Sequence, residues 1–263
     1  MATNEETPVV ILCGGFGTRI REASESLPKP MIEIGGMPIL WHIMKTYNAH
    51  GFRRFVLTCG YKAATVKDYF LRYREHLSDY TVNLGSNEPP IFHNSGLDED
   101  WEVTCVDTGL NTLTGGRLSR VRQFLDSERF LLTYGDGVAD VDITALMAAH
   151  KAHGLIGTVT AVHPTSRFGE LNTDGTSVTG FAEKPELSGG LVNGGFFVFE
   201  NEFLDNVDDD ADMLEQGALQ KLTVDGQLGH YVHEGFWRGM DTFREYKELN
   251  ALWDADEAPW KVW

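Results

Sequence analysis

The sequence has little of three features that define whole classes of protein: cysteine, positive charge and long apolar runs. Its three cysteines lie far apart in 263 residues, unlike the dense cysteine framework of a small secreted domain. It has 22 basic and 39 acidic residues, which gives a net charge of −17. This charge makes nucleic acid or an anionic membrane a poor default partner. Residues 1–8 are acidic and polar, unlike a signal peptide, and no apolar stretch approaches the roughly 20 residues that cross a bilayer. We therefore expect a cytoplasmic protein.

The cysteines and the overall composition both predict a packed core. Cys13, Cys59 and Cys105 each lie in or at the end of an apolar run, so we expect small buried side chains in a reducing compartment. Hydrophobic residues make up 42% of the chain, too many for a disordered protein. The length suits one large α/β domain or a nucleotide-binding core with a smaller second lobe.

In the first half of the chain, short apolar runs alternate with helical patterns. The runs that predict strands are 9–13, 55–59, 81–84, 102–106 and 130–134. The patterns that predict helices are 38–51, 62–74 and 117–125. Repeated β-α-β units of this kind indicate an α/β fold with a doubly wound, mostly parallel, Rossmann-like sheet.

The character of the sequence changes near residue 156. Short alternating runs follow, separated by turn residues, at 158–162, 169–173, 178–182, 192–199 and 228–232. We expect them to extend the sheet in mixed orientation as a substrate-binding lobe, followed by a helix over 241–253. The expected division is 8–155 for the nucleotide-binding core and 156–263 for the second lobe and tail, within one continuous fold.

A glycine-rich loop follows the first predicted strand. Gly14, Gly15 and Gly17 let backbone N–H groups approach a ligand without interference from Cβ, which suits phosphate. A dinucleotide fingerprint starting at Gly15 fails because Ile20 stands where glycine or alanine is needed. A P-loop fails because Thr18-Arg19 follows Gly17 in place of Lys-Ser/Thr.

The same region carries two cations. Arg19 closes the loop, and Lys29 lies between two prolines that restrict the backbone on both sides. A fixed lysine, an arginine and several N–H groups together neutralise a triphosphate. The alternative is a tight turn with two solvated cations.

These motifs, taken in order, resemble sugar-1-phosphate nucleotidylyltransferases, and within them the glucose-1-phosphate cytidylyltransferase branch. The resemblance covers nearly the whole chain from Pro8 onward. The segments that carry it are Gly14-Gly15-x-Gly17-Thr18-Arg19, Lys29-Pro30, Pro38 to Lys45, Asp107-Thr108-Gly109, Thr114-Gly115-Gly116-Arg117, Thr133 to Asp140, Val192 to Phe197, Gly235-Phe236-Trp237, Met240-Asp241-Thr242 and Ala258 to Lys261.

The resemblance implies a reaction and a set of site residues. A phosphate oxygen of glucose 1-phosphate attacks the α-phosphorus of CTP in line, assisted by Mg²⁺, giving CDP-glucose and pyrophosphate. Arg19 and Lys29 are the implied catalytic residues, and Asp136 and Asp241 the implied metal ligands. The implied nucleotide-binding residues are Leu12, Gly14, Gly15, Gly17, Thr18, Thr114, Gly116 and Arg117, with Arg117 reading the base. The implied sugar-phosphate-binding residues are Gly169, Glu183, Lys184 and Asn193.

Several of these residues also have a purely structural interpretation. Asp136 is then a turn aspartate, Asp241 a helix N-cap, Arg117 a helix N-terminal arginine, and Glu183-Lys184 an exposed turn pair.

The sequence departs from the cytidylyltransferase pattern at two places. Leu27 stands where a basic residue often occurs, and Arg238-Gly239 replaces an uncharged pair before Met240. The open alternatives are therefore UTP, dTTP or GTP as the nucleotide, another sugar 1-phosphate, or a non-catalytic regulatory homologue. The resemblance also implies a homo-oligomer, for which Trp260 and Trp263 are candidate interface anchors, and a role in making sugars for surface polysaccharides.

Overall fold

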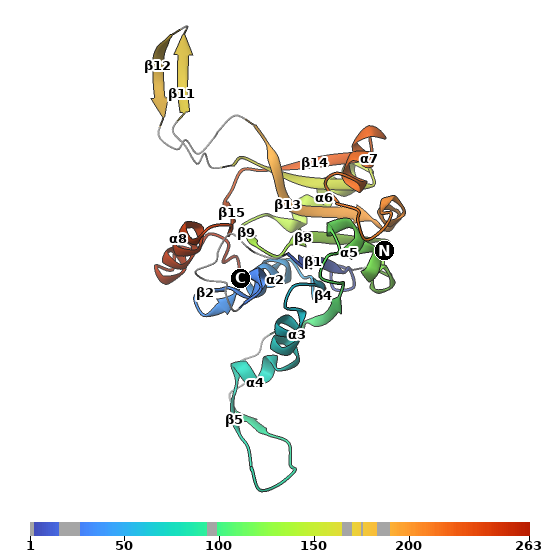
Figure 1. Cartoon of the computed structure of the whole chain (residues 1–263), viewed down its shortest axis with the longest axis vertical. Coiled ribbons are helices and arrows are strands. Elements are labelled where there is room, and N and C mark those ends of the chain that lie inside the picture. The colour runs from blue at the N-terminus through green and yellow to red at the C-terminus, as the bar shows by residue number, and fades with distance from the viewer. Residues whose placement is uncertain (1–2, 16–26, 94–98, 165–169, 175, 183–189) are drawn as a thin grey trace.

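A seven-stranded sheet forms the centre of the molecule (Figure 1). The structure is a computed structural model that describes residues 3–15, 27–93, 99–164, 170–174, 176–182 and 190–263. The strand order is β14-β10-β13-β8-β1-β4-β7. In chain order the bounds are β1 Val9–Cys13, β4 Arg54–Cys59, β7 Glu102–Asp107, β8 Arg129–Tyr134, β10 Gly157–Val162, β13 Val192–Glu200 and β14 Leu228–His233.

Every pairing in this sheet is parallel except the two made by β13. That strand runs antiparallel to both β10 and β8, whereas β1 is parallel to β4 and β8, and β10 is parallel to β14. The predicted α/β fold with a mostly parallel sheet is confirmed. Strands from before and after residue 156 share this one sheet.

Helices cover both faces of the sheet because its buried strands are apolar on both sides. In β1, Val9, Ile11 and Cys13 belong to one core cluster, and Val10 and Leu12 belong to the other. The first cluster includes buried residues of α2 (Ile39–Ala49), α3 (Ala63–Leu71), α6 (Ile143–His153) and α8 (Phe243–Asp254). The second includes residues of α5 (Thr114–Val121), α7 (Ala218–Val224) and the 3₁₀ helix η3 (Asn201–Asn206).

Among the described residues, four two-stranded sheets lie outside the central one. They are β2–β3 (Glu33–Ile34, Met37–Pro38), β5–β6 (Asp79–Thr81, Ile91–His93), β9–β15 (Gly137–Ala139, Trp237–Gly239) and β11–β12 (Glu170–Asp174, Ser177–Ala182). Figure 1 shows β5 and the pair β11–β12 projecting from opposite ends of the molecule.

Three predicted strand runs need correction. The runs at 169–173 and 178–182 were expected to extend the main sheet, but β11 and β12 pair with each other as a separate hairpin. The run at 81–84 was expected to be a strand, but β5 ends at Thr81, where its register with β6 also ends. Alternating apolar residues predict an extended backbone, but they do not specify the partner strand.

Helix boundaries also differ from the sequence expectation. The predicted helix over 62–74 is broken at Arg72 into α3 and α4 (Tyr73–Leu77). The predicted helix over 117–125 starts earlier, at Thr114, and ends in a 3₁₀ turn, η2 (Arg122–Phe124). None of the helices within the described ranges combines the length and the apolar character needed to cross a membrane.

The C-terminal aromatic residues pack inward. Trp260 is fully buried, stacks near Phe236 and Trp253, and donates from Nε1 to His42 Nδ1 at 3.3 Å. Trp263 is half-buried with its ring near Trp41. The expectation that Trp260 anchors a subunit interface is therefore wrong, because the tail seals the core of its own chain.

Candidate active site

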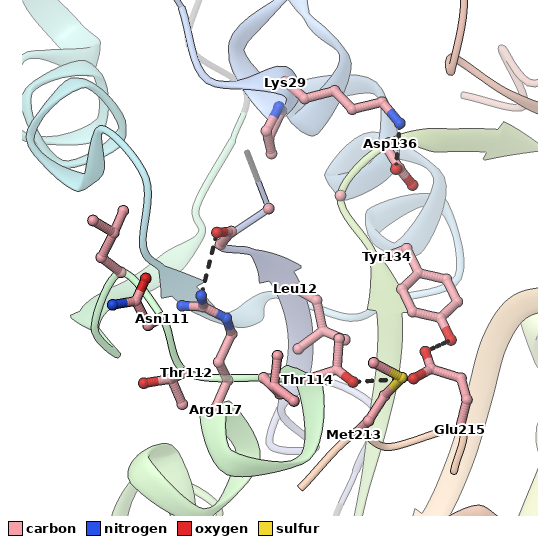
Figure 2. A pocket seen from close by; sticks show the side chains of 16 residues that line it. Leu12, Lys29, Asn111, Thr112, Thr114, Arg117, Tyr134, Asp136, Met213 and Glu215 are labelled. Atoms are coloured by element: carbon pink, nitrogen blue, oxygen red, sulfur yellow. Dashed lines mark hydrogen bonds and ion pairs between the residues drawn. The ribbon is translucent and has the colours of Figure 1, made fainter. Parts of the chain in front are cut away.

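A cavity of about 560 Å³ opens at the carboxyl ends of the parallel strands (Figure 2). The carboxyl edge of such a sheet is where open α/β folds bind ligands. Its walls come from the ends of β1 and β8, the loop between β7 and α5, and a segment before α7. The lining residues are Leu12, Gly14, Gly15, Lys29, Pro30, Leu110 to Thr114, Arg117, Tyr134, Gly135, Asp136, Met213 and Glu215.

Lys29 joins the two predicted metal ligands at one end of this cavity. Its Nζ donates to Asp136 Oδ2 at 2.6 Å and to Asp241 Oδ1 at 2.7 Å. Lys29 begins the 3₁₀ helix η1 (Lys29–Met31) between Pro28 and Pro30, whose fixed φ angles suit this tight turn. Figure 2 shows the lysine side chain reaching across to Asp136.

Burial and charge act in opposite directions on this ammonium. Burial disfavours the charged form, but the carboxylates of Asp136 and Asp241 outweigh it and raise the pKa of Lys29. The lysine side chain is only 12% exposed, against 39% for Asp136 and 38% for Asp241. The lysine side chain is therefore mostly buried, whereas the two carboxylates that it joins remain accessible to solvent.

The pairing of β9 with β15 brings the two aspartates together across the sequence. Gly137 lies opposite Gly239, and Met240 N donates to Asp136 O at 2.8 Å. Asp241 is the next residue, followed by Thr242, the N-cap of α8. Its proposed alternative as an N-cap is wrong, because Thr242 caps α8 in a capping box with Glu245.

Arg117 ties together the ends of three neighbouring strands. Its guanidinium donates to Gly14 O after β1 (3.2 Å), Cys59 O in β4 (3.3 Å), and Thr108 Oγ1 (2.6 Å) and Gly109 O (2.9 Å) after β7. The side chain is almost fully buried, and a Cβ at Gly14 would overlap its guanidinium carbon. Arg117 thus lines the cavity and also fixes the edge that forms it.

The opposite wall carries a polar chain that joins the predicted Thr114 and Asn193 through two residues that the sequence did not predict, Tyr134 and Glu215. Thr114 Oγ1 donates to Glu215 Oε2 at 3.1 Å, and Tyr134 Oη donates to Glu215 Oε1. Asn193 Nδ2 then donates to Tyr134 Oη at 3.2 Å. A tyrosine at the carboxyl end of a buried parallel strand was a usable signal. Glu215 had none, since it lies in an irregular segment positioned by tertiary contacts.

The two glycines at the start of α5 pack against another segment of the chain and not against the cavity. A Cβ at Gly116 would lie 2.5 Å from Asp210 Cα, and one at Gly115 would lie 2.9 Å from Asp212 O. The absence of side chains lets the 209–212 segment pack on the helix. Gly116 is thus buried beneath this segment, and it is not among the residues that line the cavity.

The structure brings most of the remaining predicted residues to one place. Leu12, Gly14, Gly15, Lys29, Thr114, Arg117 and Asp136 line the cavity, Asp241 reaches it through Lys29, and Asn193 through Tyr134. The predicted residues that lie outside the described ranges are Gly17, Thr18, Arg19, Gly169, Glu183 and Lys184.

The sequence is similar to those of known proteins over nearly its whole length. The family described as nucleotidyl transferase matches residues 8–254. Glucose-1-phosphate cytidylyltransferase of Salmonella typhi is 49% identical over 97% of this chain and 98% of its own length. A probable glucose-1-phosphate cytidylyltransferase of Bacillus subtilis is 40% identical over 97% and 99%.

A solved structure shares the fold at lower sequence identity. HddC from Yersinia pseudotuberculosis complexed with GMP-PN superposes with a TM-score of 0.69, at 21% identity, covering 94% of this chain and 99% of that one. At this identity the likeness concerns the fold alone.

Proposed function

The chain belongs to the nucleotidyl transferase family, and from that premise we propose that it transfers a cytidylyl group from CTP to α-D-glucose 1-phosphate, releasing pyrophosphate. The reaction type is supported by the Lys29 ammonium held between Asp136 and Asp241 at the carboxyl edge of the sheet. The choice of CTP and glucose 1-phosphate is supported by the Salmonella relative, a glucose-1-phosphate cytidylyltransferase, and by the Bacillus relative, a probable one, each of which matches 97% of this chain.

In the proposed step, a phosphate oxygen of glucose 1-phosphate forms a bond to the α-phosphorus of CTP as the bond to the β-phosphate oxygen breaks. The chain needs no covalent intermediate for this transfer. Lys29 stabilises negative charge on the phosphates, since its ammonium is held in place before substrate binds. We place Arg19 and the Gly14–Gly15 backbone on the triphosphate, and Lys184 on the sugar phosphate.

Asp136 and Asp241 are the residues that would hold Mg²⁺. The donor set fits, because Mg²⁺ takes one or two carboxylates and completes its shell with water and phosphate oxygens. Both carboxylates reach the same ammonium, and more than a third of each side chain is exposed. When bound, the ion supplies positive charge to the triphosphate and to the leaving pyrophosphate.

We propose that the base lies against Thr114 and Arg117, in the first turn of α5. Cytosine offers O2 and N3 as acceptors, and Arg117 lines this part of the cavity beside Thr114. Its existing bonds to the strand ends preorganise the guanidinium, so we expect it to bind the base and hold the pocket wall at once.

We further propose a cytoplasmic homo-oligomer whose product serves surface polysaccharide synthesis. The oligomer is supported by exposed apolar side chains on the projecting segment around β5 and β6. Ile91 is 63% exposed, and Leu84 is exposed on the same segment. Large apolar side chains that are exposed together mark interaction sites more often than singly exposed ones do.

The test is pyrophosphate release by the purified full chain with glucose 1-phosphate and CTP, UTP, dTTP, ATP or GTP in turn. We expect strong preference for CTP, loss of activity in EDTA, and recovery when Mg²⁺ is restored. Preference for another nucleotide would retain the reaction and overturn the base assignment. No release with any of the five nucleotides, across several sugar 1-phosphates, would overturn the proposed function.

A further inference from the structure

A polar chain runs from the nucleotide side of the cavity to the strand that carries Asn193. Its members in order are Thr114, Glu215, Tyr134, Asn193 and the backbone N–H of Gly195. Figure 2 shows the first part of this chain, with Tyr134 and Thr114 both directed at Glu215. Thr114 Oγ1 also accepts from Leu214 N at 2.9 Å, so the hydroxyl proton is free to point at the carboxylate.

The two ends of this chain fix the direction of every hydrogen bond in it. Gly195 N donates to Asn193 Oδ1 at 2.8 Å, and a backbone N–H acts only as a donor. The amide nitrogen of Asn193 must therefore face Tyr134, whose oxygen accepts from it. The single hydroxyl proton of Tyr134 is then directed to Glu215, which as a carboxylate acts only as an acceptor.

The surroundings hold the ring of Tyr134 in place. The ring lies against the backbone of Gly195, where a Cβ would come within 2.5 Å of Cδ2, and Gly195 has φ +81°. Glycine at this position therefore permits both the turn and the contact.

We infer that the Tyr134 hydroxyl, with its proton fixed by Glu215, is a positioning group that sets the orientation of the Asn193 amide for the sugar phosphate. An amide has two N–H donors and two acceptor lone pairs, and one of each is used by Tyr134 and Gly195. The exposed Asn193 thus presents one N–H and one lone pair in fixed places, which suits a pair of neighbouring hexose hydroxyls. This inference rests on the proposed assignment of Asn193 to the hexose.

The inference predicts a selective loss of sugar-phosphate affinity. Tyr134→Phe keeps the ring but removes the acceptor for Asn193, so the KM for glucose 1-phosphate should rise roughly tenfold, the effect of about one hydrogen bond. The KM for CTP should change less than about twofold, and the melting temperature should stay near that of wild type. Tyr80→Phe, at an exposed tyrosine of β5, is the matched control and should leave both constants unchanged.

A second variant tests whether Glu215 acts through Tyr134. Glu215→Gln should raise the KM for glucose 1-phosphate several-fold in the wild-type background and not at all in the Tyr134→Phe background. Additive effects in the double variant would overturn the relay. An unchanged KM for glucose 1-phosphate in Tyr134→Phe, or an equal rise for CTP, would overturn the positioning role.

The wild-type measurement separates this inference from the proposed function. If wild type prefers another nucleotide or sugar phosphate, the proposed substrates are wrong, and the ratio of variant to wild type is measured with the preferred pair. If wild type turns over no pair, calorimetric binding of glucose 1-phosphate replaces KM. Absence of binding to wild type would then overturn the hexose assignment of Asn193 and the inference with it.

Discussion

Lys29 illustrates how one residue combines a structural and a chemical role. Its ammonium lies between two carboxylates and neutralises part of the repulsion between their negative charges. The same ammonium lines the cavity where we place the phosphates. Its side chain is mostly buried, so it loses little conformational entropy when substrate binds. It also keeps its position as negative charge develops on the phosphates.

Replacing Lys29 therefore tests the chemistry at the residue scale. We expect Lys29→Ala to lower kcat/KM about 10²–10³-fold, as the loss of one preorganised charged donor does. Circular dichroism should show an intact fold. The exposed Lys221, which pairs with Asp208, provides the control, and Lys221→Ala should retain activity. A fully active Lys29→Ala enzyme would exclude the assigned role.

Residues in local motifs were predictable, and residues held by distant contacts were not. Lys29 between two prolines and Asp136 after an apolar strand carry their signals in neighbouring sequence. Glu215 reaches Tyr134 across 81 positions and Thr114 across 101, so nothing near it in the sequence marks it.

At the scale of elements, the cavity edge depends on how closely strand ends approach α5. The guanidinium of Arg117 lies against Gly14 and is held by a carbonyl at the end of β4 and by carbonyls that follow β1 and β7. The hydrogen bonds of this one guanidinium therefore connect α5 to the ends of three strands. Because the guanidinium is fixed by several bonds, it cannot move aside at low cost.

Gly14 and Gly15 give a matched pair of variants for this contact. Gly14→Ala should lower the free energy of unfolding by about 1–3 kcal/mol, because its methyl group overlaps Arg117. No described atom lies within 4 Å of a Cβ at Gly15, so Gly15→Ala should stay within about 0.5 kcal/mol. Urea unfolding without ligand measures both, and equal stability of the two variants would contradict the contact.

Element types were predicted better than element limits. The strands 9–13 and 55–59 lie inside observed strands, because buried parallel strands are continuous apolar runs. The run 102–106 also lies inside a strand, β7, although this edge strand is only partly buried. The run 81–84 misled because its apolar residues, including Val82 and Leu84, are exposed on a projecting hairpin. Exposure of this kind depends on the assembled molecule.

Strand order belongs to the scale of the whole molecule, and no local pattern specifies it. β13 lies between β10 and β8 and runs against both, so residues of the second half complete the sheet of the first. This insertion places Asn193 beside Tyr134, a contact across 59 positions. The alternating pattern of β13 indicated a strand, but its place depends on packing across the sheet.

The C-terminal tail packs against His42, a buried residue of α2. Its Nε2 lies 2.9 Å from Ile34 O, and its Nδ1 accepts from Trp260 Nε1 at 3.3 Å. Since Trp Nε1 only donates, Nδ1 must be unprotonated and the proton lies on Nε2. A second proton would oppose the Trp260 donor and charge a buried ring.

This arrangement predicts a pH dependence of the stability of the whole chain. Burial, only partly opposed by backbone hydrogen bonds to Ile34 and Met37, lowers the pKa of His42 from 6.5 to about 4. Between these values the unfolded chain binds more protons than the folded one, so stability is retained above pH 6.5 and lost as the pH falls toward 4.

The loss between pH 7.5 and 5 should be about 2 kcal/mol from this group alone. His42→Gln should be less stable than wild type at pH 7.5, because it loses the ring packing, but the gap should narrow by about that amount at pH 5. His93→Gln, at an exposed histidine of β6, should keep the wild-type pH dependence. Urea unfolding at both pH values measures the gap, and a gap that stays constant would show that His42 is not held neutral by the fold.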